Sequence, residues 1–186
     1  MNVYDFDGTI YDGDSTVDFY LFSLLRHPSL LRFFPVQTAA YFKYLCGFCT
    51  KEAAKEEFYS YFSGLCDIQR EVGLFWDRNY RKIKHFYLKR HRPDDVVISA
   101  SGRFLLSDIC KRLGIRRLIA SEVDIKTGHL LSPNCHGTEK LKRLKQEYPG
   151  EIIDEFYSDS LSDEPLAKAA RAAYMVKKNR ISRWKV

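Results

Sequence analysis

The sequence lacks any long uncharged hydrophobic run and has few residues that interrupt regular structure. Only six of its 186 residues are proline and ten are glycine. The most apolar stretch, residues 29–48, contains Arg32 and Lys43, and Pro35 interrupts its helical pattern. A membrane-spanning helix needs about 20 predominantly apolar residues, so the sequence predicts none. With 45% hydrophobic and 29% charged residues, the chain suits one compact core plus a small insertion, and nothing in its composition indicates disorder.

Cysteine is scarce, and its odd count argues against a disulfide framework. The five cysteines are Cys46, Cys49, Cys66, Cys110 and Cys135. Since no signal peptide opens the sequence, we predict free thiols in a reducing, cytoplasmic compartment. Cys46 and Cys49 form a CxxC pair, but a redox motif needs a helix start after a strand, and a zinc site needs two further ligands. Packing within an apolar helical segment is therefore favoured for this pair.

The chain carries a formal net charge of +6, which attracts anions. Phosphorylated metabolites, nucleic acid and acidic lipid surfaces all fit such a field, and charge alone does not choose among them. No recognised nucleic-acid-binding motif accompanies the basic tail at residues 177–185, so no nucleic-acid partner is expected. The sequence gives no indication of the oligomeric state.

Hydrophobic spacing divides the chain into two kinds of segment. Residues 2–6 form a short apolar run that predicts a buried strand leading into a turn. From Asp14 to about Leu88 the spacing is helical, and three or four helices are expected. After Pro93 the pattern alternates between strand and helix. It predicts strands at 95–100, 117–121, 153–158 and 174–177, helices at 104–113, 138–148 and 165–173, and a hairpin at 123–131.

This alternation predicts an α/β fold class. The core is expected to be a Rossmann-like parallel sheet with helices on both faces, formed by residues 1–13 and 89–186. Residues 14–88 are expected to form a small all-helical cap inserted after the first strand.

Four polar motifs follow predicted strand ends or open a helix. They are Asp5-Phe6-Asp7-Gly8-Thr9, Ser99-Ala100-Ser101-Gly102, Lys140, and Asp159-Ser160-Leu161-Ser162-Asp163. Ligands in parallel sheets bind at the carboxyl ends of the strands. Around a cation, two carboxylates two residues apart can serve as nucleophile and as acid/base. A serine hydroxyl, free N–H groups and a lysine at a helix start can bind phosphoryl oxygens, and further carboxylates suit Mg²⁺.

Each motif alone also has an ordinary structural explanation. Asp5 and Asp7 could form a turn and cap pair, and Ser99 could bond its own backbone. Lys140 could be one more solvated charge, and the later aspartates could cap a helix. These explanations do not account for the order of the motifs on one α/β pattern, so a shared phosphate site is favoured.

The order of the motifs resembles the signature of the haloacid dehalogenase (HAD) superfamily, over nearly the whole chain. The resemblance implies that Asp5 becomes an aspartyl phosphate and that Asp7 is the acid/base. It implies Mg²⁺ as cofactor, held by Asp5, Asp7 and Asp159, with Asp163 behind them. The implied catalytic residues are Asp5, Asp7 and Lys140, and the implied phosphate contacts are Asp5, Phe6, Asp7, Gly8, Ser99, Ala100 and Lys140.

The predicted helical insertion resembles the cap of the phosphoserine phosphatase branch. Ile98-Ser99-Ala100-Ser101 and the segment 133–140 are also similar to that branch. Asp14 stands where those enzymes carry an acid, usually Glu, that recognises the substrate ammonium. Asp14 is therefore a candidate for substrate specificity. The second motif lacks the Ser-Gly-Gly of those enzymes.

A second resemblance concerns bacterial phosphatidylglycerophosphate phosphatases of this fold. It is carried by Tyr157-Ser158-Asp159-Ser160 and Asp163-Glu164-Pro165-Leu166. Those proteins also have an apolar stretch in the cap, which here contains Phe33, Phe34, Tyr41, Phe42 and Tyr44 beside Arg26, Arg32 and Lys43. Such a mixture can sit at an anionic membrane surface. A cap core with a solvated face is favoured, and peripheral membrane contact stays the alternative.

We therefore expect a Mg²⁺-dependent phosphomonoester hydrolase that acts on a small phosphorylated metabolite. A membrane-surface lipid phosphatase and a phosphotransferase remain alternatives. The candidates for contacting a second anionic group of the substrate are Lys51, Lys55, Arg78 and Arg81.

Overall fold

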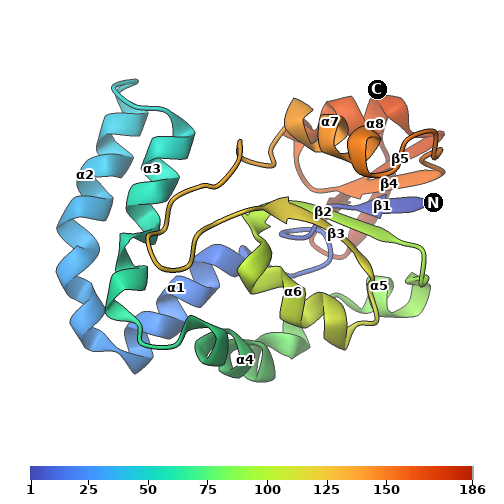
Figure 1. Cartoon of the computed structure of the whole chain (residues 1–186). Coiled ribbons are helices and arrows are strands. Elements are labelled where there is room, and N and C mark those ends of the chain that lie inside the picture. The colour runs from blue at the N-terminus through green and yellow to red at the C-terminus, as the bar shows by residue number, and fades with distance from the viewer. Residues whose placement is uncertain (186) are drawn as a thin grey trace.

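The computed structural model describes residues 1–185, which form a six-stranded sheet and its flanking helices (Figure 1). The strand order is β3-β2-β1-β4-β5-β6. The first five strands of this order are parallel, and β6 pairs antiparallel with β5. The strands are β1 (Asn2–Tyr4), β2 (Val96–Gly102), β3 (Arg117–Ser121), β4 (Glu155–Ser158), β5 (Ala172–Lys177) and β6 (Arg180–Arg183).

Five helices are inserted between β1 and β2, and three more alternate with the later strands. The inserted helices are α1 (Ser15–Arg26), α2 (Phe34–Leu45), α3 (Lys51–Phe58), α4 (Ile68–Asn79) and α5 (His85–Arg90). The later ones are α6 (Arg103–Arg112), α7 (Thr138–Glu147) and α8 (Glu164–Ala169). Polar side chains fix several starts, since Asp14, Thr50 and Asp67 accept N–H bonds from the first turns of α1, α3 and α4.

Successive side chains of the central strands point to opposite faces of the sheet, and each face carries its own apolar core. Val3 and Phe156 pack on one face against Leu144 of α7 and Leu166 of α8. Their neighbours along the strands, including Tyr4, pack on the other face with α1, α4 and α6. The expected α/β architecture with helices on both faces is thus confirmed (Figure 1).

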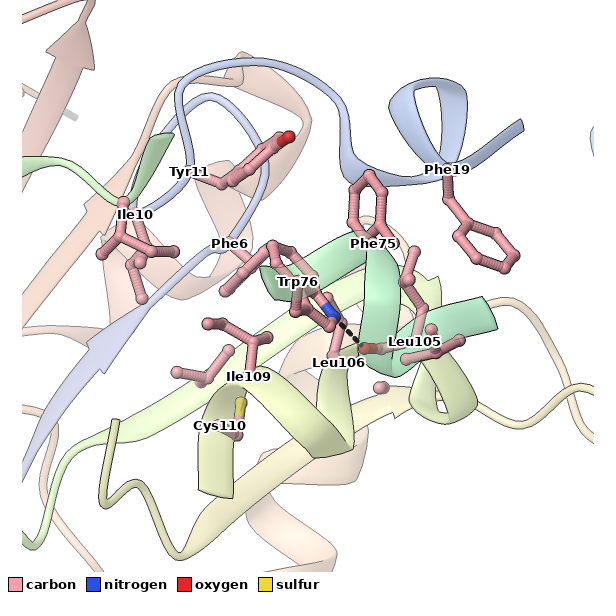
Figure 2. Packing of buried hydrophobic residues seen from close by; sticks show 14 of the residues in the cluster. Phe6, Ile10, Tyr11, Phe19, Phe75, Trp76, Leu105, Leu106, Ile109 and Cys110 are labelled. Carbon is pink, nitrogen blue, oxygen red and sulfur yellow. Dashed lines mark hydrogen bonds between the residues drawn. The ribbon is translucent and has the colours of Figure 1, made fainter. Parts of the chain in front are cut away.

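The inserted helices α1 and α4 share the second of these cores with α6. Figure 2 shows Trp76 of α4 between the rings of Phe6 and Phe75 and the aliphatic side chains of α6, with its indole Nε1 donating to Leu105 O at 2.7 Å. Phe104 continues this contact, because its ring lies against Phe19 of α1 and Phe62. Part of the insertion is therefore joined to the sheet domain through a continuous aromatic core.

The sequence-based element boundaries need three corrections at the end of the chain and in one loop. The basic tail contains a strand, β6, which the charged sequence of the tail does not predict. The predicted helix 165–173 is shorter, because α8 ends at Ala169 and β5 already begins at Ala172. The expected hairpin at 123–131 is reduced to a single antiparallel bridge between Val123 and Leu130.

Within residues 1–185 no helix is both long and apolar enough to cross a membrane. The apolar stretch in the insertion is also not the cap core that was favoured. Phe33 is half-buried, but Phe34, Tyr41, Phe42 and Tyr44 are exposed. The favoured packing of the CxxC pair is wrong for Cys46, which is exposed, and the two thiols are not bonded to each other.

Candidate active site

The first motif leaves the carboxyl end of β1, the strand that lies between β2 and β4. Asp5 continues the strand, since its N–H donates to Tyr157 O at 2.9 Å. Its side chain is buried, and among the described residues Thr9 Oγ1 is the one hydrogen-bond donor to Oδ2, at 3.4 Å. The chain then turns at Gly8, whose φ of +69° is a conformation that favours glycine.

A buried lysine joins the first and last motifs. Lys140 lies in the first turn of α7, and its Nζ donates to Asp5 Oδ1 at 2.7 Å and to Asp163 Oδ2 at 2.8 Å. Ser158 Oγ donates to the same Asp163 oxygen at 2.8 Å. All of these side chains are buried, so the ammonium has two carboxylate partners in a site that water screens poorly.

Asp7 is held by three donors from two segments, the start of α1 and strand β2. Ser15 N donates to Oδ1 at 2.6 Å, while Ser101 Oγ donates to Oδ2 at 2.5 Å and Ser99 Oγ to the same atom at 3.4 Å. Ser99 Oγ also accepts from Ser101 N at 3.0 Å. Ser99 and Ser101, in the last part of β2, therefore orient the Asp7 carboxylate as well as line the pocket.

Asp159 lies directly against the turn of the first motif. A Cβ added to Gly8 would stand 1.9 Å from Asp159 Oδ2. Any side chain at position 8 would therefore displace this carboxylate. Lys84 supports the same turn from outside, donating to Gly8 O and, at 2.8 Å, to Lys178 O.

Burial dominates the titration of the site. It raises the pKa of Asp5 to about 7, against the opposing effect of Lys140. It also raises the pKa of Asp7, with Asp14 contributing in the same direction, and the pKa of Asp159. On α3, burial lowers the pKa of Lys55 to about 8. Burial makes the ionised forms of these carboxylates less stable than they would be in water. A bound cation, or a proton shared between two carboxylates, would offset this loss of stability.

These groups line one cavity of about 520 Å³. It contains predicted residues from all four motifs, namely Asp5, Asp7, Gly8, Ser99, Ala100, Lys140, Asp159 and Asp163, together with Asp14. The side chain of Phe6 is not among them, because it packs in the core against Tyr11 and Trp76. Of the basic candidates, Lys51 and Lys55 line the cavity, and Arg78 and Arg81 do not.

Lys55 has a more specific place than the sequence indicated. Its Nζ donates to Ala100 O at 2.5 Å and to Asn134 Oδ1 at 2.7 Å, so that α3 contacts both the second motif and the loop before α7. Asp14, by contrast, caps α1 through Thr16 N and Val17 N. Sequence reasoning missed Lys84 altogether, since an isolated lysine in a helical region carries no distinguishing signal.

The residues at the turn suit a hard divalent cation. The donor set of Asp5 and Asp159 carboxylates with the Asp7 carbonyl consists only of oxygen, as Mg²⁺ prefers. Asp163 Oδ1 is buried without a hydrogen-bond partner in the part of the chain that the structure describes, leaving an acceptor for a metal-bound water. Within residues 1–185 no group of three or more His, Cys, Asp or Glu side chains could hold a metal ion. A cation here would therefore depend on main-chain oxygen and water as well.

The family comparison agrees with the motif order. The sequence profile of the haloacid dehalogenase-like hydrolase family matches residues 3–168. A comparison with curated proteins finds no match.

Solved structures share the fold at low sequence identity. A protein of unknown function from Bordetella pertussis Tohama I has a TM-score of 0.76 and 20% identity, covering 93% of this chain and 87% of that one. A probable phosphoserine phosphatase from Vibrio cholerae has a TM-score of 0.62 and 13% identity, with coverages of 92% and 55%. A phosphoserine phosphatase solved as a phospho-aspartyl intermediate analogue has a TM-score of 0.54 and 16% identity, with coverages of 92% and 83%.

Proposed function

Because this chain belongs to the haloacid dehalogenase-like hydrolases, we propose that it is a Mg²⁺-dependent phosphomonoester phosphatase with Asp5 as its nucleophile. The observation that carries the proposal is the bridge from Lys140 to Asp5 and Asp163 at the floor of one cavity. A buried ammonium beside a buried carboxylate is suited to a phosphoryl group that arrives with negative charge and then becomes attached to that carboxylate.

In the first half-reaction an Asp5 oxygen attacks phosphorus. A bond forms between this oxygen and phosphorus, and the bond from phosphorus to the leaving oxygen breaks. Asp7 gives that leaving oxygen its proton, a role supported by the raised pKa of the Asp7 carboxyl. Ser15 N and Ser101 Oγ keep the carboxyl in one orientation during the transfer.

In the second half-reaction Asp7 takes a proton from water, and the water oxygen attacks the aspartyl phosphate. Inorganic phosphate leaves, and the Asp5 carboxylate is restored. Lys140 neutralises charge on the phosphoryl oxygens in both halves, helped by the hydroxyl of Ser99 and by main-chain N–H groups. When bound by Asp5, Asp159 and the Asp7 carbonyl, Mg²⁺ would supply further charge neutralisation.

The proposed substrate is a small phosphorylated metabolite. The cavity of about 520 Å³ supports this size, and it offers both signs of charge beyond the phosphate, Asp14 on one side and Lys51 and Lys55 of α3 on the other. The inserted helices, residues 14–88 in the proposed division, would act as the cap that excludes water and selects the leaving group.

The test is turnover of purified protein with Mg²⁺ on phosphoamino acids, sugar phosphates, nucleotides and detergent-solubilised phosphatidylglycerophosphate. Asp5→Asn should reduce kcat by about 10³-fold or more, because the amide cannot form the aspartyl ester. Removing Mg²⁺ with a chelator should likewise abolish phosphate release, and adding it back should restore activity.

The matched control is Asp12→Asn, an exposed carboxylate in the same loop, which should keep wild-type turnover. Thermal unfolding should show that both variants are folded. Full activity in Asp5→Asn would contradict the nucleophile assignment. Transfer of phosphate to an added alcohol in place of release would instead identify a phosphotransferase.

A further inference from the structure

One surface of the insertion exposes an unusual concentration of large hydrophobic side chains. Residues 31–48, here called the apolar arm, contain eight of the sixteen large hydrophobic residues that are exposed within residues 1–185. They are Leu31, Phe34, Val36, Tyr41, Phe42, Tyr44, Leu45 and Phe48. Scattered apolar side chains on a surface need no explanation, whereas a contiguous group marks an interaction site.

The apolar arm has little packing partner within the described chain. Helix α2, its main element, buries only Gln37 and Ala40, and its neighbour α3 buries no residue. In Figure 1, α2 is the outermost helix of the molecule, and α3 lies between it and the sheet domain. Phe48 follows α2 at the turn toward α3 and is 83% exposed. Of the eight side chains, Val36 lines a cavity between α2 and α3, and the others project from a protruding part of the molecule.

The charges within the apolar arm and the chain on either side of it have one sign. No Asp or Glu occurs between Asp18 and Glu52, while Arg26, Arg32, Lys43 and Lys51 fall in that interval. Arg26 is paired with Glu71 at 2.7 Å. The other three form no ion pair among the residues that the structure describes. The arm therefore combines exposed aromatic residues with Arg32 and Lys43, which are free of ion pairs among the described residues, while the acidic residues that line the same cavity as Lys43 are Glu56 and Glu57, on the α3 side of α2.

We propose that the apolar arm docks on the surface of an anionic lipid bilayer. Helix α2 has 12 residues and a length of about 18 Å, well short of the roughly 30 Å hydrocarbon core, so it would lie in the interface. Tyrosines such as Tyr41 and Tyr44 suit the headgroup level. Lys43 among them would meet anionic headgroups. A second copy of the chain fits less well, because a symmetric contact would bring the same basic residues together.

Docking in this way leaves the candidate active site accessible. Lys51 and Lys55 of α3 line the cavity, and α2 lies on the outer side of α3. The cavity would then be about one helix layer, roughly 8–10 Å, from the lipid surface. Vesicle binding is measured without turnover, so the membrane-docking proposal can be tested independently of the phosphatase proposal.

The experiment is flotation of the full chain with vesicles of phosphatidylcholine alone or mixed with phosphatidylglycerol. We expect binding to the anionic vesicles only, weakened by high salt. The Phe42→Ser/Phe48→Ser double variant should lower the partition coefficient by at least about tenfold, because two aromatic rings no longer enter the interface. Lys43→Gln should lower it about fivefold. Asp5→Asn should bind like the wild type.

The matched controls are Leu131→Ser and Lys111→Gln. Leu131 is 68% exposed, against 64% for Phe42, but lies outside the apolar arm, and Lys111 is exposed on α6. Both controls should bind like the wild type, and thermal unfolding should show that every variant is folded. No binding, equal binding to both vesicle types, or unchanged binding of the double variant would overturn the proposal. So would a lipid-free dimer that dissociates in the double variant, since it would assign the arm to a second copy.

Discussion

Asp95 lies at the start of β2, at the opposite end of that strand from the candidate active site, and it is completely buried. Its Oδ2 accepts from Arg92 N at 2.8 Å, whereas Oδ1 has no partner among the described residues. Burial raises the pKa of this carboxyl to about 6. The main-chain N–H of Arg92 is the one hydrogen-bond donor to this carboxylate among the described residues, so removal of the charge should stabilise the fold.

We predict that Asp95→Asn raises the free energy of unfolding at pH 7–8 by about 1–2 kcal/mol. Because the folded-state pKa lies above the unfolded value, the neutral form stabilises the protein below about pH 4, and this stabilisation is lost as the pH rises through 6. The gain of the variant should therefore shrink on acidification. Urea unfolding at several pH values measures the gain in the free energy of unfolding. The control is Glu147→Gln, which removes a carboxylate that is exposed. A gain independent of pH would contradict the explanation.

Most residues of the candidate site could be predicted because short motifs carry them. Asp5 and Asp7 are two positions apart at a strand end, and Asp159 and Asp163 are four apart after another strand. From the sequence Lys55 is only a candidate, since nothing in its local sequence tells whether α3 turns it toward water or toward Ala100. The direction of the Lys55 side chain depends on how α3 packs against the sheet, and the spacing of residues in the sequence does not predict that packing.

At the scale of elements, α3 reaches the sheet domain largely through polar groups. Lys55 bonds the second motif, and Glu56 Oε1 accepts from Leu130 N at 2.8 Å. The ammonium of Lys55 is costly here, because burial lowers its pKa to about 8. Without it, one of its two acceptors would keep a donor, because the single hydroxyl proton of Ser121 can be donated to Ala100 O, at 2.8 Å, or to Asn134 Oδ1, at 2.9 Å.

Lys55→Met should therefore have opposite effects on stability and activity. We expect the free energy of unfolding to rise by about 1–2 kcal/mol at pH 7, because the buried charge is removed. As the pH rises from about 8 to 10.5, the difference in the free energy of unfolding between variant and wild type should disappear. The reason is that Lys55 loses its proton at lower pH in the folded state than in the unfolded state. Turnover should fall, because the cavity loses a positive charge. The control is Lys51→Met, since Lys51 is exposed and lies one helical turn before Lys55. It should change the free energy of unfolding by less than about 0.5 kcal/mol. A large loss of stability in Lys55→Met would contradict this account.

The sequence also predicted the five parallel strands, but not β6. The predicted strands are short apolar runs, which is typical of buried parallel strands. In β6 the run Arg180-Ile181-Ser182-Arg183 has one apolar residue, and its charges suggested a solvated tail. The run itself has too little hydrophobic pattern to predict a strand, and it becomes one through its antiparallel pairing with β5, in which Ile181 is opposite Val176. An edge strand rich in arginine is recognisable only once its partner strand is known.

At the scale of the whole molecule, the five thiols divide by burial. Cys46 and Cys66 are exposed and Cys49 is partly exposed, whereas Cys110 and Cys135 are buried. Burial raises the pKa of Cys135 to about 11 and that of Cys110 to about 12, so both remain protonated and unreactive.

We predict that a thiol reagent at pH 8 labels Cys46, Cys49 and Cys66 in the folded protein and leaves Cys110 and Cys135 unmodified. All five should react in denaturant, because unfolding removes the burial. Peptide mass spectrometry identifies the labelled positions, and a Cys66→Ser variant should lose one label only. Rapid labelling of Cys135 in the native protein would show that the loop before α7 opens to solvent.

The exposure of the apolar arm was beyond prediction from sequence. A helical segment rich in phenylalanine and tyrosine normally packs into a core. Whether it does depends on whether the rest of the chain provides a facing surface. In this molecule the aromatic residues of α1 and α4 mainly meet Phe104 and α6, and Tyr20 of α1 reaches α2 through a hydrogen bond to the buried Gln37.

The aromatic core that α1 and α4 share with α6 also limits how substrate can reach the cavity. Swinging the whole insertion away as a rigid lid would expose Phe19 and Trp76, which are buried against the sheet domain. Helix α3 has no fully buried residue. Lys55 donates to Ala100 O, Glu56 accepts from Leu130 N, and the ring of Phe58 at the end of the helix packs against Tyr20 and Tyr61. A hinge motion of the α2–α3 hairpin about this end would expose less apolar surface than release of the whole insertion, so we expect substrate to enter and leave by that motion, with α1 and α4 remaining in place.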